Sequence, residues 1–171
     1  MSAEKKGGAK ARKLGRGELS TDLYDQPGHL IRRAHQISLS MYQAVIGGDV
    51  TPIQYAALRI LQDHPDIDQV TLAKYCALDT STAATLAVKL EERGLVERSV
   101  VEGNRRARAL RLTKAGERLL ESLVSSVHEL RQRMLEPLTA DEQRLFLELL
   151  TKFVHLNNEQ SRAPLRRDEA A

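Results

Sequence analysis

The sequence predicts a mainly α-helical protein that carries one small β-hairpin. The 171 residues include 42% hydrophobic side chains, which is enough to bury one sizeable core. Over most of the chain, apolar residues recur at alternating spacings of three and four, the period of an amphipathic helix. Aromatic residues are scarce, with two Phe, four Tyr and no Trp, which argues against an aromatic-rich β-sandwich.

The two ends of the chain differ in composition from its middle. Residues 1–20 are rich in lysine and glycine, so we expect a disordered basic tail that raises affinity for a polyanion. Residues 160–171 are polar and contain Pro164, and we expect a flexible C-terminal tail there. The formal net charge is only +3, so the distribution of charge matters more than its size.

The first two predicted helices each have one apolar side. The first covers residues 29–46 and ends before a Gly-Gly pair, with an apolar stripe at Leu30, Ala34, Ile37, Met41 and Ala44. The second begins with Thr51 as N-cap and Pro52 as first helical residue, and it stops at His64 and Pro65. The stripe on the first helix needs a partner surface to cover it.

A short third helix is expected over about residues 69–77, and a fourth starts after Asp79 or Thr80 and runs to Arg93. The fourth segment, DTSTAATLAVKLEERG, has two contrasting faces. Its apolar face holds Ala83, Leu86, Ala87 and Leu90. Its outer face holds Ser81, Thr82, Thr85 and Lys89. Small hydroxyl side chains near a helix N-terminus can approach phosphates and base edges closely, although the alternative is that they only cap the helix.

The stretch VVEGNRRARALRLT, at residues 100–113, predicts a β-hairpin that turns at Gly103 and Asn104. Arginines cluster around this turn at Arg105, Arg106 and Arg108. They form either a solvated tip or an arm that reaches a negatively charged partner.

The order of the elements decides between these two interpretations. Two short helices joined by a tight turn, followed by a two-stranded hairpin, make a winged helix-turn-helix. A narrow minor groove of DNA concentrates negative potential and favours arginine inserted from a slender arm. We therefore expect the wing to carry Arg105 and Arg106 at its tip, with Arg108 or Arg111 closer to the DNA backbone. The expected DNA-binding residues are Ser81, Thr82, Thr85, Lys89, Asn104, Arg105, Arg106 and Arg108.

The last third of the chain predicts two further helices. The first follows Thr113 as N-cap and runs almost to Pro137, which makes a rod of roughly 35 Å with an apolar stripe at Leu119, Leu123, Val127, Leu130 and Met134. The second starts after Thr139, where Thr-Ala-Asp-Glu forms a capping box, with apolar residues at Leu145, Phe146, Leu149, Phe153 and Leu156.

The small winged unit cannot cover the apolar sides of these helices alone, so we expect a homodimer. The dimer would present two copies of the fourth predicted helix, the reading helix, about one DNA turn apart. In this division, residues 21–50 and 114–159 form a helical dimerisation region from both ends of the chain. Residues 51–113 form the winged helix-turn-helix.

The sequence resembles the MarR family of bacterial transcriptional regulators. The matching motifs are TPIQYAALRIL, TLAKYCALDTSTAATLAVKLEERGLVER and NRRARALRLTKAGERLL, and the resemblance covers about residues 30–156. It implies a reading helix in the major groove, a wing in the minor groove and a dimer formed by the terminal helices. Wings of this family often carry aspartates before the arginine pair, whereas Val101 and Asn104 stand at those places here.

The resemblance also implies a small-molecule effector, often an aromatic acid, bound between the dimer helices and the winged unit. The segment YDQPGHLIRRAHQIS is similar to a subgroup that controls aromatic-acid catabolism, in which effectors can be coenzyme A thioesters. Adjacent arginines suit a phosphorylated ligand. The expected ligand-binding residues are Arg32, Arg33, His35, Ser38, Tyr42 and Tyr55. The alternative is that the arginines form surface ion pairs and that His35 is a satisfied interfacial histidine.

Other classes of protein have less support in the sequence. No glycine-rich phosphate loop, nucleophile elbow or metal-ligand spacing is present, so we expect no enzymatic activity, no cofactor and no metal. No apolar run approaches about 20 residues, which predicts a cytoplasmic protein without a membrane partner. A non-specific DNA-coating protein and a regulator without an effector remain as alternatives. The single Cys76 is either a buried thiol or a redox switch.

Overall fold

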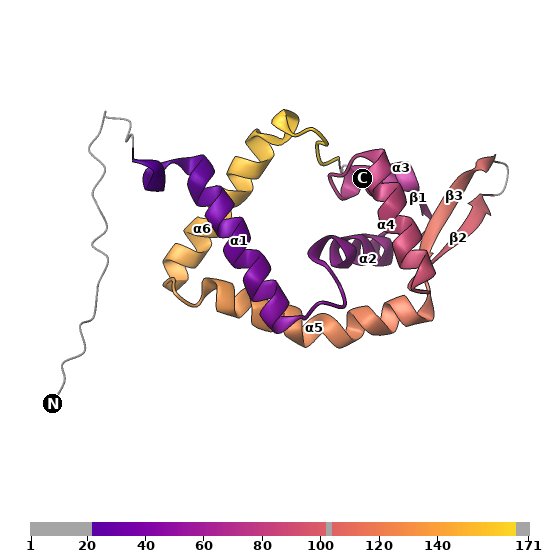
Figure 1. The fold of residues 1–171 in the computed structure, drawn as a ribbon, viewed down its shortest axis with the longest axis horizontal. Helices are drawn as coiled ribbons and strands as arrows, with labels where there is room; N and C mark the ends of the chain where they lie inside the picture. Colours follow the sequence, from indigo (N-terminus) through magenta and orange to yellow (C-terminus); the bar gives the residue numbers. More distant parts are fainter. Residues whose placement is uncertain (1–21, 102–103, 167–171) are drawn as a thin grey trace. The chain divides into compact units, whose positions relative to one another are not determined.

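The computed structural model describes residues 22–101 and 104–166, and the side chains of residues 100, 101 and 104–108 lie outside that description. The main helices are α1 (Pro27–Val45), α2 (Pro52–Asp63), α3 (Gln69–Tyr75), α4 (Thr80–Glu92), α5 (Lys114–Leu135) and α6 (Ala140–Leu156). Short 3-10 helices are η1 (Leu23–Asp25) and η2 (Asn158–Gln160), and the strands are β1 (Ile67–Asp68), β2 (Val96–Val101) and β3 (Asn104–Leu112). This arrangement confirms the mainly α-helical class with a small β-hairpin (Figure 1).

The chain divides into two compact units, of which the first ends at Gln36 and the second begins at Ile37, so the boundary lies inside α1. In the first unit, the carboxylate of Asp22 caps η1 by accepting the N–H of Tyr24 at 3.0 Å. The ring of Tyr24 meets the ring of His29 edge to face, with 5.5 Å between the centroids. The winged helix-turn-helix lies within the second unit.

A leucine core holds the winged helix-turn-helix together. The side chains of this core that are fully buried come from α2, α3, α4 and β3, and they are Leu58, Leu61, Leu72, Leu90 and Leu110. Burying one leucine side chain contributes about 1.5–3 kcal/mol, so this cluster fixes the helices against the sheet. The apolar face expected on the fourth helix is confirmed, because Ala83, Leu86, Ala87 and Leu90 are all buried.

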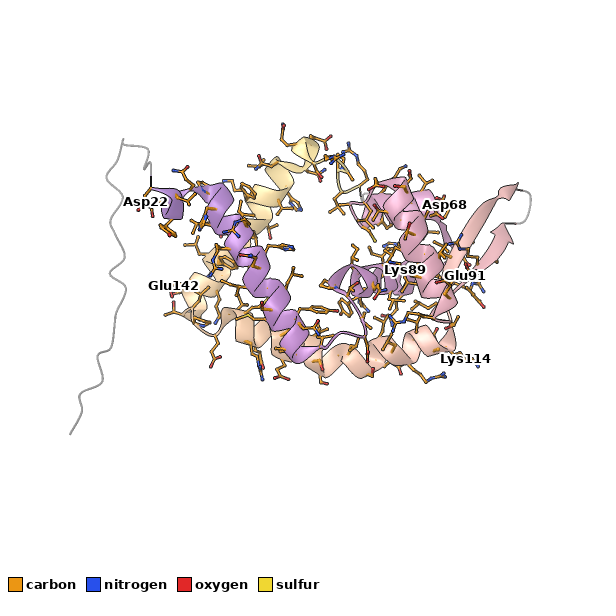
Figure 2. All side chains as sticks on the ribbon, in the orientation of Figure 1. Asp22, Asp68, Lys89, Glu91, Lys114 and Glu142 are labelled. Atoms are coloured by element: carbon orange, nitrogen blue, oxygen red, sulfur yellow. The ribbon has the colours of Figure 1, made fainter. Side chains whose placement is uncertain are left out.

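The helix caps follow the local sequence signals. Thr51 caps α2, and its hydroxyl accepts the N–H of Gln54 at 3.3 Å while the Gln54 side chain accepts the N–H of Thr51 at 3.0 Å. The capping box expected at Thr139 is confirmed, since Glu142 accepts the N–H of Thr139 at 2.8 Å. Glu142 is visible at the start of α6 in Figure 2. Thr113 caps α5, as expected.

The sheet has three antiparallel strands in the order β1-β3-β2. The two-residue strand β1, paired through Ile67 opposite Leu110, was not expected, because so short a strand carries no periodicity of its own. The expected turn also needs correction. Asn104 is the first residue of β3 and pairs with Val101, so it lies in a strand and not in the turn. The register of the β2–β3 pairing shifts between Val100 and Val101. Residues 102–103 lie outside the described residues.

The C-terminal segment, where a flexible tail is expected from residue 160, makes hydrogen bonds as far as Arg166. The Asn158 side chain accepts the N–H of Leu165 at 2.8 Å and donates to its carbonyl at 3.0 Å. Arg166 pairs with Glu159 at 2.6 and 2.8 Å, and its N–H donates to the carbonyl of Lys74 on α3 at 3.0 Å. These hydrogen bonds hold the segment in place as far as Arg166. Amino-acid composition does not predict specific hydrogen bonds of this kind. Residues 1–21 and 167–171, where the basic tail and the end of the C-terminal tail were expected, lie outside the described residues.

Candidate nucleic-acid interface

The outer face of α4 presents small polar side chains to solvent. Ser81, Thr82, Thr85 and Lys89 are all exposed, as their helical positions predict. Lys89 is labelled on α4 in Figure 2. With the apolar face of α4 buried in the core, this outer face is left free to meet a partner.

Asp79 organises the N-terminal turn of α4. Its carboxylate accepts the N–H of Thr82 at 2.9 Å, the hydroxyl of Ser81 at 2.5 Å and the hydroxyl of Thr82 at 2.7 Å. The hydrogen bonds from the Ser81 and Thr82 hydroxyls, followed by the backbone bond from Thr82, hold the pKa of Asp79 well below its usual range. The carboxylate is therefore ionised at neutral pH, and it places one negative charge beside the hydroxyls expected to contact DNA.

A shallow groove of about 430 Å³ runs beside this face, between α4 and the start of α2. Its walls come from the outer face of α4, from the cap residue Thr51, and from Ile53 and Gln54 of α2. The side chain of Gln54 also accepts a long hydrogen bond of 3.4 Å from Arg93, just past the end of α4. Reasoning from sequence missed this contribution of α2, because nothing local to Thr51 or Gln54 signals which helix lies opposite.

The β2–β3 hairpin extends beyond α3 and α4 in Figure 1. The side chains of Asn104, Arg105, Arg106 and Arg108 lie outside the described residues, so their roles stay predictions. At the base of the hairpin, Nε of Arg98 on β2 lies 2.9 Å from Oε2 of Glu91 on α4. This ion pair links the wing to the last turn of the reading helix, whose Glu91 is labelled in Figure 2.

Arg111 was one of two arginines expected to lie near the DNA backbone, and it is paired with Asp66. Its guanidinium makes a two-pronged contact with Asp66, with Nη2 at 2.6 and 2.7 Å from the two carboxylate oxygens and Nε at 2.8 Å from Oδ1. Asp66 stands at a positive φ of 64°, and its N–H donates to the carbonyl of Leu110. Arg111 therefore braces the base of the wing against β1.

The six residues expected to bind a ligand fall into both units. In the first unit, Arg32 and Arg33 are exposed and each donates to the Gln36 side chain, at 2.9 and 3.4 Å. These contacts are not the surface ion pairs of the alternative interpretation, because Gln36 carries no charge. His35 is exposed in the same unit.

In the second unit, Tyr42 is the buried residue of α1 among those expected to bind a ligand. Ser38 lies one helical turn before it and is half-buried. Tyr42 is only 8% exposed, and its hydroxyl meets no hydrogen-bond partner among the described residues. Burial, followed by the neighbouring Tyr55, raises the pKa of Tyr42. Tyr55 also lines a separate cavity of about 390 Å³ between α2 and α5, where Arg59, His128 and Arg131 supply cationic or ionisable groups.

Within residues 22–101 and 104–166, no cluster of three or more His, Cys, Asp or Glu side chains is arranged to hold a metal ion. None of the helices in these ranges is both long and apolar enough to cross a membrane.

Comparison with known proteins decides the family. The sequence pattern of the MarR family matches residues 48–107, which contain the reading helix and most of the hairpin. The HTH-type transcriptional repressor NicR of Pseudomonas putida is 31% identical over 134 residues, which are 78% of this chain and 85% of NicR. The chain belongs to the MarR family. It is therefore related to DNA-binding transcriptional regulators, and the resemblance drawn from its motifs is confirmed.

Solved structures of MarR-type regulators agree with this assignment. PcaV of Streptomyces coelicolor, in complex with its natural ligand, is 33% identical with a TM-score of 0.75, over 81% of this chain and 98% of PcaV. BpsR of Bordetella bronchiseptica, whose DNA binding is regulated by 6-hydroxynicotinic acid, is 28% identical with a TM-score of 0.73, over 78% of this chain and 98% of BpsR. The winged helix-turn-helix fold of this MarR-family chain is thus shared along nearly the whole length of both regulators.

Proposed function

We propose that the chain is a dimeric, sequence-specific transcriptional repressor, released from a pseudo-palindromic operator by a small aromatic acid or its coenzyme A thioester. One observation carries the DNA-binding part. In its N-terminal half, the exposed outer face of α4 holds the short hydroxyl side chains of Ser81, Thr82 and Thr85, while the opposite face is buried in the core. A helix whose first turns carry only short side chains on the free face can bring them close to base edges in the major groove.

The wing supplies the second contact in this proposal. Asn104, Arg105, Arg106 and Arg108 belong to β3, and the arginines at the end of the hairpin suit the narrow minor groove beside the site of α4. The Arg98–Glu91 ion pair and the Arg111–Asp66 contact support this role, because they hold the hairpin at a set position relative to α4.

The apolar surface that the terminal helices leave exposed supports the proposed homodimer. α6 has no buried residue, and its large apolar side chains are between 45% and 75% exposed at Leu145, Phe146, Leu149, Leu150, Phe153, Val154 and Leu156. On α1, Leu30, Ile31, Ile37 and Leu39 are also exposed. So much apolar surface needs a partner, and a second copy of the chain would bring two reading helices to two half-sites.

The effector class is suggested by the relatives. 6-Hydroxynicotinic acid, which regulates BpsR, is an aromatic acid, and PcaV has a natural ligand. In this chain, the buried Tyr42 hydroxyl lacks a partner among the described residues, and a phenol or carboxylate of the ligand could provide one. We propose that Ser38, Tyr42 and Tyr55 contact the aromatic acid. Arg32, Arg33 and His35 are proposed for its carboxylate, or for the phosphates of a thioester.

A titration at fixed salt tests the proposal. The purified protein is added to DNA from upstream of its own gene and to a scrambled control, with and without p-coumarate, p-coumaroyl coenzyme A or 6-hydroxynicotinate. Specific binding that one of these compounds abolishes is the expected result. Equal affinity for both DNAs would instead indicate a DNA-coating protein. Specific binding that no compound disturbs would reject the aromatic effector and leave the regulator.

Two variants divide the proposal into its parts. Arg106→Ala is expected to weaken operator binding by about 1–3 kcal/mol if this side chain enters the minor groove, and unchanged affinity would return the hairpin to the solvated-tip interpretation. Tyr42→Phe removes only the hydroxyl, so operator binding should be retained while release by the effector requires a higher ligand concentration. Unchanged release would remove Tyr42 from the ligand site.

A further inference from the structure

The three hydroxyls on the outer face of α4 all have their protons engaged. The Ser81 hydroxyl donates to Oδ1 of Asp79 at 2.5 Å, and the Thr82 hydroxyl donates to Oδ2 at 2.7 Å. One turn later, the Thr85 hydroxyl donates to the backbone carbonyl of Ser81 at 3.1 Å. All three side chains are exposed, so their remaining hydrogen-bonding capacity is open to solvent.

The direction of these hydrogen bonds is fixed by the partners. A backbone carbonyl oxygen has no proton to give, and neither has an ionised carboxylate. Asp79 is ionised at neutral pH, as an aspartate with an ordinary pKa would be, and its hydrogen bonds lower the pKa further. Each hydroxyl must therefore be the donor within the protein, which leaves only lone pairs for an outside partner.

We propose that the N-terminal half of α4 reads DNA as an acceptor-only surface, and that it selects the exocyclic amino groups of adenine and cytosine in the major groove. This rests on the proposed function, in which α4 enters that groove. Adenine N6 and cytosine N4 are the major-groove donors, whereas guanine and thymine present acceptors at O6, N7 and O4. An acceptor of the protein placed against an acceptor of the base leaves both without a partner, which disfavours guanine and thymine under this turn.

Toward the C-terminal end of α4, the outer face changes from hydrogen-bond acceptors to a hydrogen-bond donor. Lys89 lies one turn beyond Thr85, is exposed, and carries an ammonium group that can only donate. The helix therefore offers acceptors first and a donor afterwards. We expect each half-site to place an amino-bearing base edge under Ser81 and Thr82, and a guanine edge or a phosphate near Lys89.

Base analogues in a selected duplex test the proposal directly. A random duplex library is first selected for binding, and each adenine and cytosine of the half-site is then replaced singly. Purine replaces adenine to remove N6, 2-pyrimidinone replaces cytosine to remove N4, and 7-deaza-adenine removes N7 and keeps the amino group. We expect at least one amino deletion to weaken binding about tenfold and the N7 deletion at that base to change it less than twofold. The same analogues in the flanking DNA control for weakened base pairing.

Asp79→Asn provides the matching change in the protein. Asparagine is as good an N-cap as aspartate, but its amide N–H₂ donates to a hydroxyl and frees that proton to point outward. We expect the selected position to broaden from amino-bearing bases to include guanine or thymine, with at least a fivefold change in the preference ratio. The ratio is the measured quantity, because removing a negative charge raises affinity for all DNA.

Asp68→Asn is the control variant. Asp68 caps α3 as Asp79 caps α4, with its carboxylate accepting the N–H groups of Val70 and Thr71 at 2.7 and 2.9 Å. Both substitutions remove the same charge, but Asp68, labelled in Figure 2, is the N-cap of α3, the helix before the reading helix α4. Base preference should stay unchanged in this variant, and the same broadening in Asp68→Asn would overturn the assignment to Asp79.

The outcomes separate this proposal from the function on which it rests. Loss of binding on N7 deletion, with amino deletions neutral, would overturn the acceptor-only surface and leave a sequence-specific regulator. A selection that enriches no sequence would overturn both. Amino-dependent binding whose preference broadens in Asp79→Asn alone supports the proposal.

Discussion

Gly116 lies in the first turn of α5, where the helix passes close to the backbone of Leu95. A Cβ atom at this position would overlap the carbonyl oxygen of Leu95, and the Leu112 side chain leaves little room on the other side. The same carbonyl accepts the N–H of the α5 cap residue Thr113 at 3.1 Å, so it cannot move away without loss. The glycine of the LTKAG motif is thus required by a close approach of two backbones.

Replacing Gly116 with alanine is therefore expected to destabilise the protein. We expect a loss of about 1–3 kcal/mol in the free energy of unfolding, measured by urea denaturation, because the overlap forces a shift of backbone. Gly28→Ala is the control, since nothing lies within 4 Å of its added Cβ and it sits in the helix α1. Equal midpoints for the two variants would show that α5 adjusts to the added methyl group.

The thiol of Cys76 is expected to react slowly with alkylating reagents. Burial raises its pKa to about 11, so the neutral thiol persists at pH 8 with roughly a hundredfold less thiolate than a thiol of pKa 9. Alkylation by iodoacetamide at pH 8 should be far slower in the native protein than in urea. Stability should also fall as pH rises from about 9 to 11, where the unfolded thiol ionises before the folded one. Equal labelling rates in the two states would revive the redox-switch alternative.

At the scale of elements, the segment after α6 depends on one side chain. Asn158 clamps Leu165 through two hydrogen bonds, and the next residue, Arg166, bonds to the Lys74 carbonyl near the end of α3. Asn158→Ala should release this segment, which trypsin would report as faster cleavage after Arg162 and Arg166. Asn157→Ala is the control, because its side chain donates to the Phe153 carbonyl within the α6 cap, whereas the side-chain bonds to Leu165 and Arg166 come from Asn158 and Glu159. Identical cleavage rates would mean that the Glu159–Arg166 ion pair alone holds the segment.

At the scale of the whole molecule, the exposed apolar face of α6 should control assembly. Leu149 is 54% exposed in the middle of that face, so Leu149→Asp is expected to raise the dimer dissociation constant at least a hundredfold, measured by sedimentation equilibrium. Thr151→Glu adds a charge on the opposite side of the same helix and should leave the dimer intact. Operator affinity should fall with dimer content, because two linked half-site contacts bind more tightly than one. A dimer that survives Leu149→Asp would place the interface elsewhere.

The parts of the fold that could be predicted from the sequence are those determined by residues close to one another in the chain. The N-cap at Thr51, the capping box at Thr139 and the two faces of α4 depend on neighbours at most four positions away. The acceptor polarity of the α4 hydroxyls belongs to the same class, since Asp79 lies two and three residues before Ser81 and Thr82. A closer reading of the DTST segment as an aspartate cap could have found it.

By itself, the sequence determined the order of the helices, their caps, the winged helix-turn-helix and the face that α4 turns outward, because these follow from periodicity and from local hydrogen bonds. The tertiary structure alone decided which distant residues meet. Asp66 and Arg111 are 45 residues apart and pair only because β1 joins the sheet beside β3. The Arg166 contact to Lys74 and the burial of Tyr42 likewise depend on packing between remote segments, which no local pattern encodes.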